Sequence, residues 1–446
     1  MSQKMRVIAL VDMDCFYCQV EEKLNPALQG KPVAVVQYNL WREGGIIAAN
    51  YLAKEKGVTK GMWMHEAKDL CPEIQFARVA ELRGRADLTK YREAGKQVAN
   101  VLNSFTNLLE RASVDEAYLD LTEAVKLELM KGISNIPLEN LKTTHVVGCD
   151  TSDFISNIGN NEDTDGFCED DLKLAIGGII VEKIRAAVYE RTGYRCSAGI
   201  SHNKILAKLV CGLHKPNKQT ILPQNAISQY FSELPLRKIK RLGGKFGKKV
   251  AEELGIQYVG ELLKFSDKEL SKKFDAKTGQ WLYNIARGID NEPVSPKLIS
   301  KSISCCKRFP GKNALFKHKD VEHWMNELGL EVSERLEKDQ EENSRKAKMI
   351  TISFTQEINK NDVSNSKTCR LKSYDAKKIA EDALQVIIKN CKKLDGLYHV
   401  KYLGLSVGNF EDIKQKKDIK YFLARKNTQD MSKIESQNNE SECDNS

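Results

Sequence analysis

The chain has 446 residues, with 70 lysines and arginines against 61 aspartates and glutamates and a formal net charge of +9. At about 100–200 residues per domain, this length allows roughly two to four domains with sizeable cores. A charged fraction of 29% and a hydrophobic fraction of 41% exclude a disordered or fibrous chain. Apolar runs are too short to span a membrane, and no cleavage-site pattern follows the first residues, so we expect neither a membrane span nor a signal peptide.

Hydrophobic periodicity predicts a mixture of strands and helices in the first half of the chain. The run at 112–121 alternates around a central acidic pair and predicts two strands with a turn. Strands are also expected at 5–11, 32–37 and 46–49, and helices at 88–109 and 174–191.

The segment 149–171 is strongly acidic, with eight acids and no lysine or arginine. Such a composition buries little apolar surface, so we expect a mobile surface loop. A calcium loop is the alternative, but the spacing of an EF-hand is missing.

The opposite charge gathers at 235–251, which has seven bases and no acid. Within it, the glycine-rich run 242–247 predicts a hairpin between two short helices. Exposed backbone amides beside lysines suit phosphate, which favours binding to a nucleic-acid backbone. The alternative is a solvated helix face.

Two prolines at 292–296 predict an interdomain linker. After it, alternating and helical patterns predict a small α+β domain, and from 426 the chain is polar and expected to be disordered. The strands are expected at 300–306, 349–356, 368–372 and 400–409, and the helices at 321–338 and 375–389.

The most informative side chains are three acids in apolar strands: Asp12, Asp115 and Glu116. Carboxylates in core-like strands are costly to bury unless a positive group neutralises them. Hard oxygen ligands with few histidines nearby suit Mg²⁺, and two such ions can activate a 3′-hydroxyl and stabilise a departing pyrophosphate. The alternative is that these acids cap turns or pair with Arg111 and lysines.

Several motifs resemble those of the Y-family, translesion DNA polymerases. Residues 11–17 and 112–118 are similar to the two metal-site motifs of that family, and 196–208 to its third palm motif. The resemblance covers residues from about 5 to 410. A narrower resemblance to the eta branch rests on 34–41, 44–51, 211–220 and 309–312.

The resemblance implies roles for individual residues. It implies that Asp12, Asp115 and Glu116 are catalytic and hold two Mg²⁺ ions together with the backbone carbonyl of Met13. Tyr17 matches the aromatic steric gate that excludes a 2′-hydroxyl. The nucleotide-binding positions are Phe16, Tyr17, Tyr51, Lys54, Lys60 and Lys215; the template-base contacts are Gln37 and Ile47; the DNA contacts are Arg237, Lys238, Lys240, Arg241, Lys245, Lys248 and Lys312.

The family commonly has arginine at the positions of Lys54 and Lys60. Lysine keeps the positive charge but lacks the planar fork that binds in two places. The contacts that arginine makes with the incoming nucleotide in the family therefore do not carry over unchanged to Lys60.

The implied architecture is an α+β right-hand polymerase with palm, fingers, thumb and a little-finger domain. The boundaries expected from the resemblance are 1–15 and 77–223 for the palm, with an acidic insertion at about 135–171; 16–76 for the fingers; 224–290 for a thumb with a helix-hairpin-helix; 291–299 for the linker; 300–412 for the little finger; and 413–446 for a polar tail.

The implied function is DNA-directed DNA synthesis on primer–template DNA with dNTPs, past lesions such as cyclobutane thymine dimers, without proofreading and in the nucleus. A clamp-binding peptide is a further possibility at Ile419, Phe422 and Leu423, against the alternative that these residues end a packed strand or helix. The sequence also leaves open a different Y-family branch, such as a kappa-like extender, and a non-catalytic DNA-binding relative.

Overall fold

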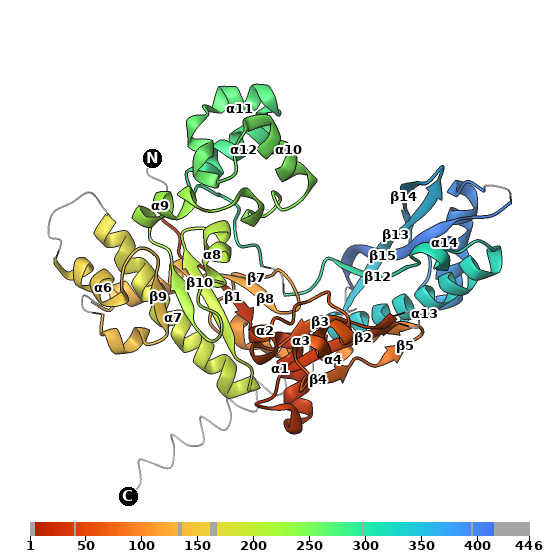
Figure 1. Cartoon of the computed structure of the whole chain (residues 1–446), viewed down its shortest axis with the longest axis horizontal. Helices are drawn as coiled ribbons and strands as arrows, with labels where there is room; N and C mark the ends of the chain where they lie inside the picture. Colours follow the sequence, from red (N-terminus) through yellow and green to blue (C-terminus); the bar gives the residue numbers. More distant parts are fainter. Residues whose placement is uncertain are drawn as a thin grey trace, which may run out of the picture. The chain divides into compact units, whose positions relative to one another are not determined.

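The computed structural model describes residues 5–39, 42–132, 136–160, 167–296, 298–393 and 396–413. The chain forms two compact units, Met1–Ile299 and Ser300–Ser446 (Figure 1). Both units contain helices and sheets, as the expected α+β class requires. Within the described ranges, no helix is long and apolar enough to cross a lipid bilayer.

A six-stranded sheet forms the centre of the first unit, in the order β7-β8-β1-β10-β11-β9. Strand β1 pairs antiparallel with both β8 and β10. Strand β11 pairs parallel with both β10 and β9. The strands are β1 (Ile8–Met13), β7 (Leu109–Arg111), β8 (Glu116–Asp120), β9 (Thr144–Val146), β10 (Cys196–Ser201) and β11 (Gln219–Ile221).

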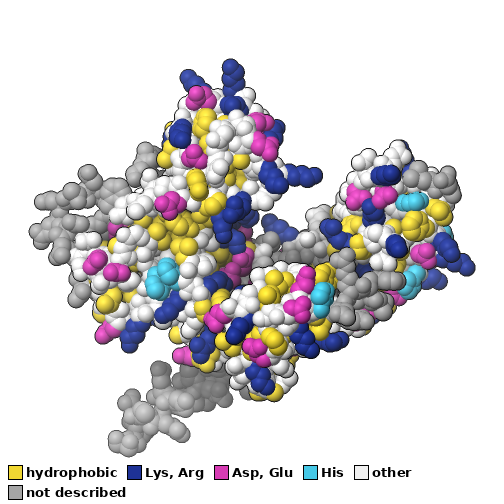
Figure 2. All heavy atoms as spheres, viewed as in Figure 1, with side chains coloured by type: hydrophobic (Ala, Val, Ile, Leu, Met, Phe, Trp, Pro, Cys, Tyr) yellow, Lys and Arg dark blue, Asp and Glu magenta, His cyan; other side chains and the backbone are white. Residues whose placement is uncertain are grey.

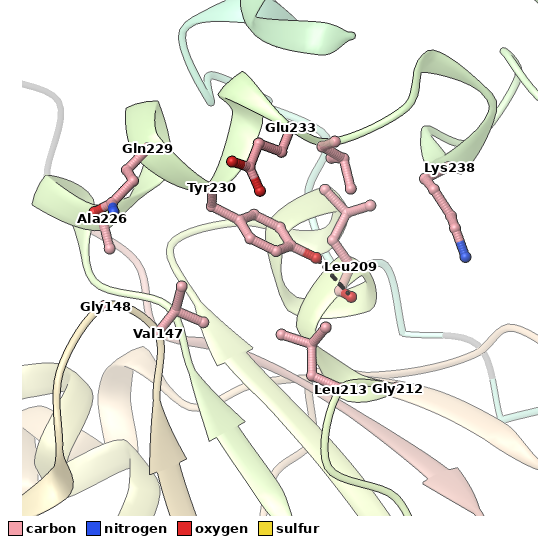
Figure 3. A pocket seen from close by; sticks show the side chains of 11 residues that line it. Val147, Gly148, Leu209, Gly212, Leu213, Ala226, Gln229, Tyr230, Glu233 and Lys238 are labelled. Carbon is pink, nitrogen blue, oxygen red and sulfur yellow. Dashed lines mark hydrogen bonds between the residues drawn. The ribbon is translucent and has the colours of Figure 1, made fainter.

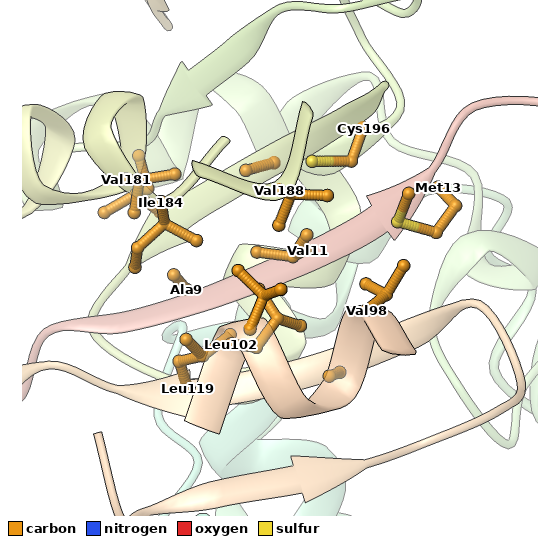
Figure 4. Close-up of a cluster of buried hydrophobic side chains, with 14 of the residues drawn as sticks. Ala9, Val11, Met13, Val98, Leu102, Leu119, Val181, Ile184, Val188 and Cys196 are labelled. Carbon is orange, nitrogen blue, oxygen red and sulfur yellow. The ribbon is translucent and has the colours of Figure 1, made fainter. Parts of the chain in front are cut away.

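Alternation along β1 gives the sheet two different faces. Ala9, Val11 and Met13 point into a large core that the sheet shares with several helices, and Figure 4 shows this cluster. Ile8 and Leu10 point the other way, into a smaller cluster under helix α8 (Lys204–Cys211). The helices that contribute to the large core include α4 (Thr89–Asn103), α5 (Thr122–Met130) and α7 (Phe167–Thr192).

A smaller three-stranded sheet, in the order β3-β2-β4, follows β1 in the chain. Its own core is built from Val36, Ile46 and Ile74 together with small residues of two short helices. The elements are α1 (Phe16–Leu24), β2 (Val33–Asn39), β3 (Arg42–Ala49), α2 (Tyr51–Glu55), α3 (Met64–Leu70) and β4 (Gln75–Arg78), followed by the short hairpin of β5 (Glu81–Leu82) and β6 (Arg85–Ala86).

The last part of the first unit is helical and has a separate core around Phe231, Val250 and Leu282. The glycine-rich run connects a 3₁₀ turn to helix α10, close to the helical hairpin that the sequence predicts. The elements are α9 (Ile227–Ser232), η4 (Leu236–Lys238), α10 (Lys245–Leu254), η5 (Val259–Lys264), α11 (Asp267–Lys273) and α12 (Ala276–Ala286), with η2 (Leu138–Leu141) and η3 (Gln224–Ala226) earlier in the chain.

The second unit is an antiparallel sheet in the order β12-β15-β13-β14, with two helices packed on one face. Every strand and helix expected after residue 300 is present, although β14 begins seven residues before its expected start. The elements are β12 (Ser302–Arg308), η6 (Gly311–Asn313), α13 (His318–Asn343), β13 (Arg345–Ile358), β14 (Asn361–Arg370), α14 (Ala376–Asn390) and β15 (Val400–Asp412).

The acidic segment is the clearest error of the sequence prediction. Instead of a loop, Thr151–Asn160 forms helix α6, and α7 already begins at Phe167; residues 161–166 lie outside the described part of the chain. Phe154 is only 4% exposed, and Ile155 and Ile158 pack against the large core. Three apolar residues at helical spacing outweighed the charge of their neighbours.

Candidate active site

Two of the three predicted catalytic acids lie directly opposite each other on neighbouring strands. Asp12 of β1 pairs in register with Glu116 of β8, and their carboxyl groups are within hydrogen-bonding reach. Alternation places Asp12 on the same face of the sheet as Ile8 and Leu10, under α8. The two side chains are 22% and 21% exposed, so both are largely withdrawn from water.

Two lysines neutralise this pair. Lys215 contacts a carboxylate oxygen of Asp12, and the Nζ of Lys208 lies 2.5 Å from Oε1 of Glu116. Burial raises the pKa of Asp12 to about 6 despite the charge of Lys215. Burial also acts to raise the pKa of Glu116, but hydrogen bonds from Asp12 and Lys208 outweigh it and the pKa is lowered.

The third predicted acid, Asp115, does not pair with a lysine as the first two do but bonds to Ser113 and Met13. Its carboxylate accepts a hydrogen bond from the hydroxyl of Ser113, while its backbone oxygen accepts one from the amide of Met13 at 3.0 Å. Across the ranges that the structure describes, no three acidic, histidine or cysteine side chains converge on a metal position. The fold therefore assembles Asp12 and Glu116 directly and fixes Asp115 beside them through its backbone.

The chemistry of this donor set fits a hard divalent cation. The ligands on offer are carboxylate oxygens from two adjacent strands, and Mg²⁺ prefers oxygen donors over imidazole or thiolate. Mg²⁺ usually keeps several waters and substrate phosphates in its coordination shell, so the protein need not supply a complete cage.

Asp14 has a positioning role that the sequence did not reveal. It is 3% exposed and accepts hydrogen bonds from Ser197 Oγ at 2.8 and 3.0 Å, from the amide of Asn217 at 2.8 Å and from Tyr51 OH at 3.2 Å. The Nζ of Lys215 lies 3.3 Å from its Oδ1. Asp14 thus connects β1, β10, the segment after α8 and the start of α2.

Of the predicted nucleotide-binding residues, Tyr51 and Lys215 contact this aspartate and Lys54 contacts Tyr51. The Nζ of Lys54 lies 4.5 Å from the centre of the Tyr51 ring. Burial opposes the charge of Lys215, but Asp12 and Asp14 outweigh it and raise its pKa, which keeps the ammonium group charged. Lys60 is exposed in the segment between α2 and α3.

The two aromatic residues at the start of α1 have opposite environments. Phe16 is 2% exposed as a whole residue, and its ring packs edge-on against Tyr194, with centroids 5.6 Å apart. Tyr17 is half-buried, and burial and the charge of Asp115 raise its pKa. The ring of Tyr17 therefore lies near the acidic site.

The predicted template contacts lie on the strands of the small sheet. Gln37 is exposed on β2 and pairs in register with Gly45 of β3. Ile47 is the extra residue where the register of these strands shifts, and it packs partly against the large core. A bulge of this kind re-aims side chains locally.

A cavity of about 380 Å³ opens beside Asp12. It extends from the sheet to the 3₁₀ turn η4, so the predicted DNA contacts Lys238 and Lys240 line the same cavity as Asp12. The cavity is rich in cations, which suits a phosphate-bearing ligand. Its charged lining residues are Asp12, Lys204, Lys208, Lys215, Lys238, Lys240 and Glu292.

A second cavity of about 540 Å³, with fewer charged lining residues, shares Leu209, Gly212 and Lys238 with the first (Figure 3). Tyr230 reaches across it and donates a 3.4 Å hydrogen bond to the backbone oxygen of Leu209. The contact joins α9 to α8 and so helps to fix the helical part of the unit over the sheet.

The remaining predicted DNA contacts are exposed on the helical part and in the second unit. Gly247 has no space for a side chain, because an added Cβ would lie 1.7 Å from the carbonyl oxygen of Leu242. Figure 2 shows lysine and arginine side chains, in dark blue, on the surface of the helical part of the first unit. The exposed residues are Arg237, Arg241, Lys245 and Lys248, with Lys312 in η6 of the second unit.

Three family descriptions match the chain in order. The "impB/mucB/samB family" matches residues 11–212, the "DNApol eta/Rev1, HhH motif" matches 234–289, and the "impB/mucB/samB family C-terminal domain" matches 300–418. The chain therefore belongs to the impB/mucB/samB family, the Y family of DNA polymerases.

The chain is also similar in sequence to individual proteins of this family. DNA polymerase eta of Drosophila melanogaster is 48% identical over 92% of this chain and 49% of its own length. DNA polymerase eta of Arabidopsis thaliana is 43% identical over 90% of this chain and 61% of its own length. DNA polymerase IV of Legionella pneumophila is 33% identical over 68% of this chain and 70% of its own length. The chain thus spans 49% of the length of the Drosophila relative and 61% of the length of the Arabidopsis relative.

Proposed function

We propose that this chain is the catalytic part of a DNA-directed DNA polymerase of the translesion type. It inserts dNTPs on primer–template DNA, including opposite damaged bases such as cyclobutane thymine dimers. The observation that carries the proposal is the cross-strand pair of Asp12 and Glu116, flanked by two lysines and joined by Asp115. The similarity to eta polymerases supports the lesion class.

In this proposal Asp12, Asp115 and Glu116 would hold two Mg²⁺ ions, and the carbonyl of Met13 would be a further ligand. When bound, the metal ions would make the primer 3′-hydroxyl more acidic and would neutralise charge on the leaving pyrophosphate. The carboxyl groups of Asp12 and Glu116 are largely withdrawn from water, so bound cations would add to the neutralisation that Lys215 and Lys208 already provide.

Lys215, Lys54 and Tyr51 bind the triphosphate, and Lys60 is a further positively charged contact with the nucleotide. Lys215 is held between Asp12 and Asp14, which positions its ammonium group next to the catalytic carboxylates. Lysine serves as a point-charge partner for phosphate.

Around that centre, Tyr17 packs under the sugar and Phe16 contributes its backbone. Gln37 and Ile47 lie against the templating base. These roles follow the family resemblance, and the exposure of Gln37 and the half-buried ring of Tyr17 support them.

The domains follow the same proposal. Residues 1–15 and 77–223 act as palm, 16–76 as fingers, 224–290 as thumb and 300–412 as little finger. Bases of the thumb and Lys312 contact phosphates without reading sequence, which suits an enzyme that must accept any template.

We also propose a nuclear location, because the substrate is DNA and the eta relatives above are eukaryotic. The clamp-binding residues Ile419, Phe422 and Leu423 lie outside the described residues and rest on the sequence resemblance alone.

Primer extension on an undamaged template tests the catalytic proposal. We expect wild type to extend the primer with Mg²⁺, and Asp12→Asn or Glu116→Gln to abolish extension while DNA binding persists. Lys126→Met, at an exposed pair on α5 with a 3.8 Å separation from Glu123, is the matched control and should remain active. Extension by the acid variants at the wild-type rate would overturn the assignment of the site.

A further inference from the structure

We propose that Arg185 of α7 is a positioning residue that fixes the segment carrying Lys215 and thereby sets the affinity for the incoming nucleotide. The inference rests on the proposed function, in which Lys215 binds the triphosphate. Arg185 lies outside every motif that resembles the family, and its side chain is 6% exposed. A buried charge of this kind is costly unless it is paired and hydrogen-bonded, so its partners indicate its role.

The guanidinium group of Arg185 joins three separate segments. Its Nε donates to the backbone oxygen of Cys196 at 2.9 Å, its Nη1 to Oγ1 of Thr143 at 2.5 Å, and its Nη2 to Oδ1 of Asn217 at 3.0 Å. The carboxylate of Glu182, three residues earlier on α7, lies 3.3 Å from Nη1 and supplies the counter-charge. Because a guanidinium presents its N–H groups in a rigid planar fork, these contacts together fix its orientation.

Asn217 connects this fixed group to the acidic site. Its side chain accepts the hydrogen bond from Arg185, while its backbone amide donates to Oδ2 of Asp14 at 2.8 Å. Its φ of 53° lies in the left-handed region, which asparagine adopts more readily than most residues. Asp14 in turn lies 3.3 Å from the Nζ of Lys215. Two hydrogen bonds and one ion pair therefore connect Arg185 to Lys215.

The opposite end of the same segment is also fixed. The ring of His214 stacks on that of His145 in β9, with centroids 3.9 Å apart and an interplanar angle of 9°. The Nδ1 of His214 lies 2.9 Å from the hydroxyl oxygen of Thr220. Lys215 thus follows an end held by His214 and precedes an end held by Asn217, so release of either end gives its ammonium group more positions.

A lysine binds phosphate best when its ammonium group is already in place. The long side chain has many rotamers, and restricting them on binding costs free energy that a preorganised side chain does not lose again. Without the guanidinium fork, the side chain of Asn217 loses its anchor, and the contacts that run through Asp14 to Lys215 lose their fixed geometry. The loss weakens binding of the nucleotide rather than of DNA, because none of these residues is among those assigned to DNA.

The test is single-nucleotide insertion at varied dNTP concentration, together with primer–template binding measured by fluorescence anisotropy. Arg185→Met removes the fork but keeps an unbranched side chain. Asn217→Gly removes the acceptor and still allows a positive φ. Arg345→Met is the matched control, because Arg345 is also a buried arginine, 9% exposed and paired with Asp339 in the second unit. Thermal unfolding verifies that each variant is folded.

We expect Arg185→Met to raise the KM for the dNTP about tenfold, since a hydrogen bond to a charged group is worth about that factor in an equilibrium constant. The kcat should change less, and the affinity for primer–template should stay as in wild type. Asn217→Gly should also raise KM, and Arg345→Met should leave it unchanged. A wild-type KM in both the Arg185 and the Asn217 variant would overturn the inference.

A double-mutant cycle separates positioning from a general effect on the fold. In a Lys215→Ala background, Arg185→Met should have no further effect on kcat/KM, because the ammonium group through which it acts is already missing. An equal loss of kcat/KM in both backgrounds would mean that Arg185 merely supports the fold, and the positioning role would be refuted. If Arg185→Met does not fold, the same cycle with Asn217→Gly decides by the same criterion.

The outcomes for the inference and for the proposed function are distinct. If wild type inserts dNTPs and Lys215→Ala raises KM while the Arg185 and Asn217 variants keep the wild-type value, only the positioning role is refuted. If folded wild type inserts no dNTP with Mg²⁺, the proposed function fails and the inference fails with it.

Discussion

Lys204 provides the sharpest test of how the first unit is held together. Its ammonium group is 3% exposed and lies 2.9 Å from Oε2 of Glu110 and 2.5 Å from Oε1 of Glu292. It also lies 5.1 Å from the centre of the Tyr118 ring. Because Glu292 belongs to the segment after α12, this lysine fixes the end of the unit to its central sheet.

Other contacts hold the same segment and define what the lysine contributes. Arg6 donates to the backbone oxygens of Asp290 at 2.6 Å and of Glu292 at 2.9 Å. The amide of Ser295 donates to Glu110 at 3.0 Å, and Val294 is 4% exposed in the small cluster with Ile8 and Leu10. Residues 290–295 therefore form a strap across the sheet.

The perturbation is Lys204→Met, which keeps an unbranched apolar side chain and removes the charge. Breaking a buried ion pair by removing one partner costs ~3–5 kcal/mol. Glu292 is 55% exposed and can turn to water, whereas Glu110 is 18% exposed and stays buried. The cost is therefore expected at the lower end, about 3 kcal/mol.

Hydrogen exchange read by mass spectrometry measures this effect locally. If the strap opens with a free energy lower by about 3 kcal/mol, exchange at the amide of Ser295 rises roughly 100-fold. Lys126→Met, at an exposed lysine on α5, is the control and should leave exchange unchanged. Wild-type protection of 290–295 in a folded Lys204→Met variant would refute the reasoning that the buried lysine holds the strap.

Three further predictions follow from the site. Gly247→Ala should destabilise the helical part by ~1–3 kcal/mol, because its Cβ meets a carbonyl oxygen at 1.7 Å; Gly244→Ala, with open space around it, should not, and thermal unfolding compares the two. Removing Lys238 and Lys240 should make the slope of log K for DNA against log salt shallower by about 0.9 for each lost phosphate contact, measured by fluorescence anisotropy, and an unchanged slope would exclude them as phosphate contacts. Because burial raises the pKa of Asp12 to about 6, the folded chain binds more protons than the unfolded chain between about pH 4 and 6, so the carboxyl lowers stability as the pH rises through that window. Asp12→Asn should flatten that part of the stability profile in EDTA, and an identical profile would contradict the assigned shift.

Local patterns predicted those features that depend on neighbours in the chain. An apolar run predicted the strand that leads to Asp12 and alternation predicted the strand of Glu116, and the cost of burying carboxylates made both acids candidate metal ligands. The same reasoning selected Asp115, but the hydrogen bond from Ser113 that turns its side chain aside depends on a turn that alternation does not specify.

Long-range contacts could not be predicted from the sequence, because no local periodicity encodes them. The bond from Tyr91 to Glu21 joins residues 70 positions apart, and that from Lys215 to Asp12 joins residues 203 apart. Asp14 was noted only as part of a motif, although its burial makes it a junction of four segments. In α6, composition misled the prediction, because Phe154 and its apolar neighbours are few but correctly spaced.

The most direct test of the central claim is primer extension across a thymine dimer. Wild type and the double variant Asp115→Ala/Glu116→Ala are compared with Mg²⁺ and single dNTPs on damaged and undamaged templates. We predict that wild type inserts two adenines opposite the dimer and that the double variant inserts none while still binding DNA. Extension that stops at the dimer would contradict the eta-like function, and unchanged extension by the double variant would contradict the acidic site itself.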